Sequence, residues 1–143
     1  MTIPKIWKRI TFLSVLTLIT NSYTAAKEII NIPLQNGDVT MNIRKAIESA
    51  KTDDIKIILE KGTYFCKPDY ATEKYCAITN HGNGSKKIIF PIKGFKKVEI
   101  EGNGATILCH GQLFPFLIEE CNEVKISGLS LIHISEPTDR QKS

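Results

Sequence analysis

The chain has 143 residues with 19 basic and 15 acidic side chains, a formal net charge of +4 at neutral pH. Three of the basic residues, Lys5, Lys8 and Arg9, fall within the segment 1–26, which contains no acidic side chain. The rest of the chain is therefore close to neutral, which gives no electrostatic reason to expect nucleic acid or a membrane surface as a partner. Its length suffices for one small domain with a modest core.

Residues 1–26 have the pattern of a secretory signal peptide. The basic start is followed by an apolar run over 10–20, and Thr24-Ala25-Ala26 offers small residues for cleavage. This run is shorter than the roughly twenty apolar residues that span a bilayer. We therefore expect residues 1–26 to direct export, to the bacterial periplasm or beyond the cell, and then to be removed.

One helix is expected, from about Thr40 to Ala50. Asp38 precedes it and can cap its first turn. Apolar residues recur on one face at helical spacing, at Val39, Ile43, Ala46, Ile47 and Ala50. This helix is predicted to come before all the strands and to cover the end of the fold.

After Asp54 the period changes to that of strands. We expect strands at 55–60 and 63–65, a polar insertion over 67–74, a short strand at 76–79 and a loop at 80–84. From Lys86 onward the predicted strands are KIIFPI, KKVEIEG, ATILC, FPFLIEE and EVKISG, each bounded by Gly, Asn or Pro. The fold class is therefore all-β with one helix.

A repeat at the spacing of one solenoid coil runs through these strands. Val98-Glu99-Ile100-Glu101-Gly102 recurs as Val124-Lys125-Ile126-Ser127-Gly128. The inward Val and Ile would stack on their counterparts, while Glu99 and Lys125 would face water one above the other. A β-sandwich is the structural alternative, because it too consists of short strands with turn signals. The leading helix and the repeat favour a solenoid.

The run VEIEGNGATILCHG at 98–111, followed by FLIE and CNEVKI, resembles the N-terminal coils of glycoside hydrolase family 110. These enzymes are exported bacterial α-galactosidases that act on terminal α-1,3-linked galactose. The resemblance covers about 39–129 and implies a right-handed, single-stranded parallel β-helix of the pectate-lyase type. It also implies an inverting mechanism with two carboxylates. In the family these come from coils beyond residue 143, so no catalytic residue is assigned here.

The acidic pairs within the chain do not form an obvious catalytic couple. Asp53-Asp54 lies in a turn, Glu99 and Glu101 lie on an outer face, and Glu119-Glu120 ends a strand, where adjacent side chains point to opposite faces. His110 is the candidate substrate-binding residue, with a structural histidine bonded to a neighbouring coil as the alternative. Neither a metal site nor a cofactor is expected, since no Cys-x-x-Cys pair or His cluster has ligand spacing.

Four cysteines, Cys66, Cys76, Cys109 and Cys121, lie in the part expected to be exported. They allow three pairings. Cys66 and Cys76 bracket the polar insertion and could close it with a disulfide. Free thiols stacked in the core are the alternative.

The C-terminal segment 129–143 is predicted not to be native. Its first part, LSLIHISEPT, is the translation of a transposase adapter used in sequencing libraries, CTGTCTCTTATACACATCTCCGAGCCCACG. The native domain would then span 27–128, and His133, Glu136 and Asp139 should be given no role. Residues 129–131 can still pair as a strand, because their alternation is compatible.

The sequence therefore predicts the cap and first coils of an exported glycosidase that acts on a galactose-containing glycan, with the fragment itself inactive. One alternative is another β-helix carbohydrate enzyme, a polysaccharide lyase or a polygalacturonase-like hydrolase. The other is a non-catalytic β-helix that serves as an adhesin or binding scaffold.

Overall fold

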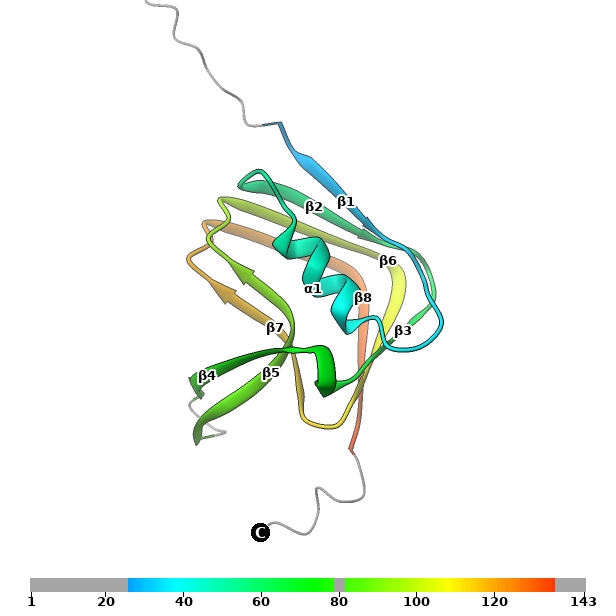
Figure 1. The fold of residues 1–143 in the computed structure, drawn as a ribbon. Helices are drawn as coiled ribbons and strands as arrows, with labels where there is room; N and C mark the ends of the chain where they lie inside the picture. The colour runs from blue at the N-terminus through cyan, green and yellow to red at the C-terminus, as the bar shows by residue number, and fades with distance from the viewer. Residues whose placement is uncertain (1–25, 79–81, 136–143) are drawn as a thin grey trace, which may run out of the picture.

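The computed structural model describes residues 26–78 and 82–135. The predicted signal peptide lies outside the described residues except for Ala26, and so do residues 136–143 of the predicted tail. The described residues are mainly strands, as an all-β class predicts (Figure 1). The elements are β1 (Glu28–Ile32), α1 (Thr40–Glu48), β2 (Asp54–Leu59), β3 (Thr63–Cys66), the 3-10 helix η1 (Pro68–Tyr70), β4 (Thr72–Ile78), β5 (Gly82–Lys93), β6 (Lys97–His110), β7 (Leu113–Glu119) and β8 (Glu123–Ile134).

Four strands, β1, β2, β6 and β8, lie side by side, and each pairs with the next in parallel (Figure 1). Their core-facing side chains are in register, because Ile30, Ile57, Ile100 and Ile126 are successive ladder partners. Ile57 and Ile100 are fully buried, whereas Ile126 on the last strand is 38% exposed. Each inward side chain thus buries apolar surface against its counterpart, at about 25 cal/mol per Å².

The repeat predicted between the segments at 98–102 and 124–128 is confirmed. Val98 and Ile100 pair with Val124 and Ile126, and Glu99 lies opposite Lys125. In the second sheet, β5 and β7 pair in parallel, and Phe90 is the partner of Phe116. These partners have the same separation in sequence as Val98 and Val124. The two rings stack with their centroids 4.9 Å apart. One repeat therefore contributes a strand to each sheet.

The spacing between the earlier strands is less regular. The interval from Ile30 to its partner Ile57 is close to that of the repeat, but the interval from Ile57 to Ile100 is much longer. The longer interval contains η1 and β4, and β4 pairs with β5 in antiparallel fashion as a hairpin. An insertion at this point therefore separates two strands that are neighbours in space.

Two predicted boundaries in this hairpin differ from those in the structure. The predicted loop at 80–84 is partly wrong, because residues 82–84 belong to β5, and β4 begins at residue 72 rather than 76. Residues 79–81 lie outside the described part. Backbone bonding between the two strands, rather than a side-chain pattern, creates this hairpin.

The predicted strands KKVEIEG and ATILC are one strand, β6, which bends over residues 102–104. Its first half pairs with β2 and its second half with β3. At the bend Asn103 and Gly104 have φ of 51° and 80°, the left-handed region that Gly and Asn reach most readily. The Asn103 side-chain amide donates a hydrogen bond to the Leu59 carbonyl oxygen at 3.0 Å. The EGNG segment at 101–104 thus forms a turn with positive φ.

The helix α1 packs against β1 and β5 and lies across the space between the two sheets (Figure 1). Val39, Ile43 and Ile47 are buried in the core. The prediction that the helix precedes all strands is wrong, because β1 comes first and pairs with β2. The predicted Asp38 cap is also wrong, because Val39 is the N-cap residue and makes no side-chain cap hydrogen bond. Asp38 lies one residue earlier, where its Oδ1 accepts a hydrogen bond from the Thr40 N–H at 2.9 Å. Among the described residues, no helix has the length and apolar character needed to cross a bilayer.

The last strand, β8, continues past Gly128 to Ile134. Its pairing with β6 shifts register between Glu101 and Ala105 and then runs from Leu129 to Ile134. This confirms that residues 129–131 can pair as a strand. Leu131 and Ile132 remain about half exposed, at 48% and 49%, because no described strand covers their outer side.

Replacing Gly102 by alanine should destabilise the fold by about 1–3 kcal/mol, the usual cost of overpacking. A Cβ at Gly102 would lie 2.4 Å from the Gly128 carbonyl oxygen, so the backbones of β6 and β8 would have to separate. Gly84→Ala is the matched control, because its Cβ meets nothing within 4 Å. It should change the free energy of unfolding by less than about 0.5 kcal/mol. Urea unfolding followed by circular dichroism measures both; equal effects would contradict the close approach.

Candidate functional site

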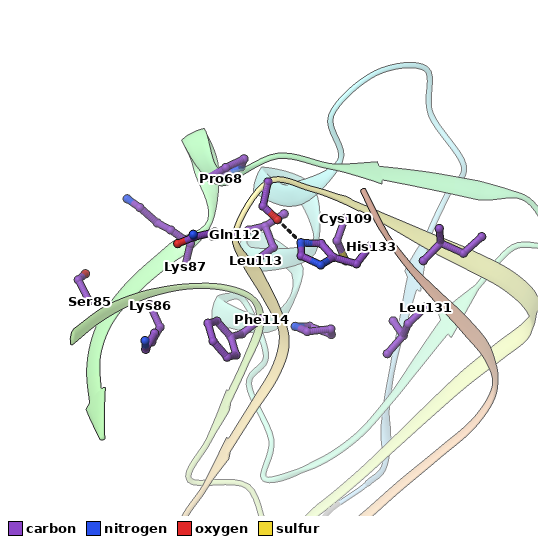
Figure 2. Close-up of a pocket in the computed structure, with 13 residues that line it drawn as sticks. Pro68, Ser85, Lys86, Lys87, Cys109, Gln112, Leu113, Phe114, Leu131 and His133 are labelled. Atoms are coloured by element: carbon purple, nitrogen blue, oxygen red, sulfur yellow. Dashed lines mark hydrogen bonds between the residues drawn. The ribbon is translucent and has the colours of Figure 1, made fainter. Parts of the chain in front are cut away.

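A cavity of about 860 Å³ opens where β5, the turn after β6 and the end of β8 meet (Figure 2). Its lining combines apolar side chains with a few polar ones: Pro68, Ser85, Lys86, Lys87, Cys109, Gly111, Gln112, Leu113, Phe114, Pro115, Leu131, Ile132 and His133. Three of these, at 131–133, come from the segment predicted not to be native. The shape of the cavity therefore depends on that segment.

The polar groups of the cavity are basic or neutral. The Lys86 ammonium lies 5.6 Å from the centroid of the Phe114 ring, a cation–π geometry. The His133 ring is hydrogen-bonded to the carbonyl oxygen of Gly111 (Figure 2). No local sequence pattern marks Lys86 or Phe114 as site residues. They are distant in the sequence, and only the pairing of β5 with β7 brings them together.

No carboxylate of the described chain lines this cavity. Hydrolysis of a glycosidic bond by the usual pair of acids needs one carboxyl group to protonate the leaving oxygen and a second to activate water or attack the sugar. The described lining residues supply neither group. What the cavity can offer a ligand is an aromatic face, two lysines and an amide, which is binding chemistry.

Four carboxylates elsewhere on the surface are hydrogen-bonded to lysines. Hydrogen bonding to Lys96 lowers the pKa of Asp53, and hydrogen bonding to Lys27 lowers the pKa of Glu99. Hydrogen bonds from Lys74 and Lys87 likewise lower the pKa values of Glu119 and Glu73. A general acid needs the opposite shift, a raised pKa that keeps its proton near neutral pH. These four groups are therefore suited to ion pairing rather than to proton donation.

The acidic pairs named from the sequence lie outside the cavity. Glu99 and Glu101 share the outer face of β6, where the Lys56 ammonium contacts both carboxylates, at 3.5 and 2.6 Å. Glu119 pairs with Lys74, and Glu120 turns away with a φ of 53° to approach Lys93 at 3.7 Å. None of these carboxylates faces the cavity.

The candidate substrate-binding residue, His110, ends β6 and is half-buried. Its ring lies against that of Phe65, with centroids 6.2 Å apart and planes inclined by 32°. It is not among the cavity-lining residues, because the neighbouring Cys109 takes the inward position and His110 points to the outer side. A role for His110 in substrate contact stays a prediction.

All four cysteines are free thiols in the structure. Cys66 is buried on β3, and its ladder partner is Cys109, which is buried on β6. Cys76 lies on β4, opposite Gly84 of the hairpin. The structure thus stacks Cys66 on Cys109 and forms no bond between Cys66 and Cys76. Among residues 26–78 and 82–135, no three His, Cys, Asp or Glu side chains come together as a metal-binding group.

Comparison with known proteins shows what the chain is similar to. It is 27% identical over 105 residues to alpha-1,3-galactosidase B of Parabacteroides distasonis. It is 29% identical over 107 residues to alpha-1,3-galactosidase A of Bacteroides fragilis strain YCH46, and 28% identical over 127 residues to alpha-1,3-galactosidase B of Bacteroides thetaiotaomicron. This chain is related to the alpha-1,3-galactosidases. The resemblance to glycoside hydrolase family 110 inferred from the residues is confirmed at that level.

The match covers a large share of this chain but a small share of each relative. The matched residues make up 69% to 83% of this chain but only 17% to 20% of these three relatives. No protein-family model matches the chain. Most of each relative therefore has no counterpart in this chain.

Acidification should weaken the fold through the outer-face ion pairs. The pKa of Glu99 in the folded chain lies below its ordinary value of 4.5, because the carboxylate is bonded to Lys27 and also approached by Lys56. A lowered pKa means that the stabilisation is present above about pH 4.5 and is lost as the pH falls through the folded value. We expect the urea midpoint to fall between pH 5 and pH 3, and to fall less in Glu99→Gln.

High salt provides the control for this prediction, since 1 M NaCl reduces the screening length to about 3 Å and weakens exposed pairs. The difference between the wild type and Glu99→Gln at pH 5 should shrink in that buffer. Equal acid sensitivity of the two proteins would contradict a stabilising role for the Glu99 carboxylate.

Proposed function

We propose that this chain is part of an exported glycosidase that releases terminal α-1,3-linked galactose from a glycan with inversion at the anomeric carbon. The observation that carries the proposal is the sequence relationship to alpha-1,3-galactosidases over about 70% of the chain. The substrate of the whole protein would be a galactose-containing oligosaccharide or glycan. Export is supported by the signal-like pattern of residues 1–26.

We also infer that the chain forms the N-terminal cap and first coils of a right-handed parallel β-helix. Five of the six ladders between the described strands are parallel. β2 and the first half of β6 would form one face of this helix, and β3 and the second half of β6 would form a second face. β5 and β7 would form the third face. The helix α1 would close the end next to β1. A sandwich is disfavoured, because its sheets are antiparallel.

The chemistry of the proposed enzyme would come from outside these residues. The pKa values of four surface acids are lowered by lysines, and no carboxylate among the described residues lines the cavity. The contribution of this chain to function would be to start the solenoid in the correct register, so that later coils stack on β8 and place their side chains in line.

The proposal that residues 129–143 are foreign to the protein explains why the cavity should not be assigned as the active site. Three of its lining residues, at 131–133, belong to this segment. The source nucleotides test the proposal directly. Codons that differ from the adapter, within a longer reading frame, would contradict it.

Activity is tested on the longer protein that contains residues 27–128. It should release galactose from a Galα1-3Gal disaccharide, as measured by coupled galactose oxidation, and proton NMR should detect the β-anomer first, because inversion at an α-linkage forms it. The chain described here should by itself release galactose no faster than the buffer.

A Galα1-4Gal disaccharide and pectin serve as controls for linkage and for substrate class. Galactose release from the 1-3 linkage with little from the 1-4 linkage supports the proposal. Release of unsaturated uronides from pectin, without galactose release from either disaccharide, would show a lyase and contradict it. Initial formation of the α-anomer would contradict the inverting mechanism alone.

A further inference from the structure

Cys66 and Cys109 occupy directly opposed positions on two neighbouring parallel strands. They are ladder partners at the ends of β3 and β6. Both follow the inward alternation of their strands, with relative exposures of 0% and 2%, so their side chains enter the same part of the core. The preceding inward pair, Tyr64 and Ile107, is stacked in the same way and is also fully buried.

The spacing of such strands suits a disulfide. Neighbouring strands lie about 4.7–4.9 Å apart in the hydrogen-bonding direction, and disulfides join Cα atoms that are about 4.4–6.8 Å apart. The bridge therefore requires side-chain rotation more than movement of the backbone. The other two cysteines are placed less well: Cys76 opposes Gly84 in the hairpin, and the Cys121 thiol contacts the carbonyl oxygens of Ile92 and Glu119.

We propose that Cys66 and Cys109 form a disulfide that joins β3 to β6 when the chain folds under oxidising conditions. The two thiols lose two protons and two electrons to a small-molecule disulfide such as oxidised glutathione, which is reduced to two thiols. One S–S bond forms in the protein and one breaks in the oxidant. The bond would close a loop that contains η1, the β4–β5 hairpin and β6 as far as Cys109.

This loop is the part of the fold that departs from the regular spacing. The interval from β2 to β6 is longer than the interval from β6 to β8 because of the inserted hairpin. Closing a longer loop removes more conformational entropy from the unfolded chain than closing a short one. A disulfide between Cys66 and Cys109 would thus hold the register of the two strands that the insertion separates in sequence.

Burial dictates when the bond can form. Removal from water raises the pKa of the Cys66 thiol to about 12 and also raises the pKa of Cys109. Since the thiolate is the species that attacks a disulfide, the folded, reduced protein should react slowly. Oxidation is expected during folding, while both thiols are exposed, and the completed bond should then resist reductants until the chain unfolds.

The test is a disulfide map of the whole chain after refolding in a buffer of reduced and oxidised glutathione. Free thiols are blocked with iodoacetamide in denaturant, and the chain is cut after Lys, Arg and Glu. Each cysteine then lies on its own peptide, with Cys66 on 62–73, Cys76 on 75–86, Cys109 on 102–119 and Cys121 on 121–123. Mass spectrometry without reduction should find 62–73 joined to 102–119.

Three variants keep the test decisive if one of them folds poorly. Cys76→Ser should retain the bridge, and the double variant Cys76→Ser with Cys121→Ser should form it with no other choice of partner. Cys109→Ser should abolish it and leave Cys66 alkylated. A bridge between the peptides of Cys66 and Cys76, or alkylation of both Cys66 and Cys109 in the refolded wild type, would overturn the proposal.

The oxidised chain should also unfold at a higher urea concentration than the same chain with a reductant present throughout refolding and unfolding. In Cys109→Ser the reductant should leave the midpoint unchanged. An equal response of the wild type and Cys109→Ser to reductant would overturn the stabilising role.

Discussion

Parallel stacking of equivalent aliphatic side chains is the interaction on which the rest of this structure depends. Ile57 and Ile100 are fully buried because each lies in register with the isoleucine of the next strand. Register is strict in such an arrangement, since a slip by one residue would turn every inward side chain outward. Spacing between repeats thus determines burial, and burial provides most of the stability.

Residues in the turns and on the outer face make contacts that fit this register. Gly102 permits the backbones of β6 and β8 to approach, while Asn103 turns the chain and donates a hydrogen bond to the Leu59 carbonyl oxygen at the end of β2. On the outside, the same stacking brings Lys56 close to Glu99 and Glu101, so oppositely charged side chains alternate between strands. The stack tolerates an insertion as well: the β4–β5 hairpin lengthens one interval without disturbing the pairing of β2 with β6.

The proposed architecture gives these residues a structural role and leaves the reacting groups to other parts of the protein. In the β-helix that we propose, each coil would contact its neighbours and few other parts of the chain, so these residues would establish register without contributing reacting groups. The described residues fit that role, because the carboxylates of Glu99 and Glu119 are bound to lysines and the cavity carries cationic, aromatic and amide groups. The relationship to alpha-1,3-galactosidases extends over less than a fifth of the first two relatives described.

The sequence by itself determined the strands with strong alternation, the helix near Thr40 and the repeat that pairs Val98 with Val124, because each is a local pattern or a direct repeat. Strand β1 and the glycine-rich start of β5 were missed or misassigned, since backbone pairing with a distant partner creates them. Only the tertiary structure decided that Cys66 lies beside Cys109 rather than Cys76 and that His110 faces outward. Those neighbours come from ladder register across an insertion, which no local pattern records.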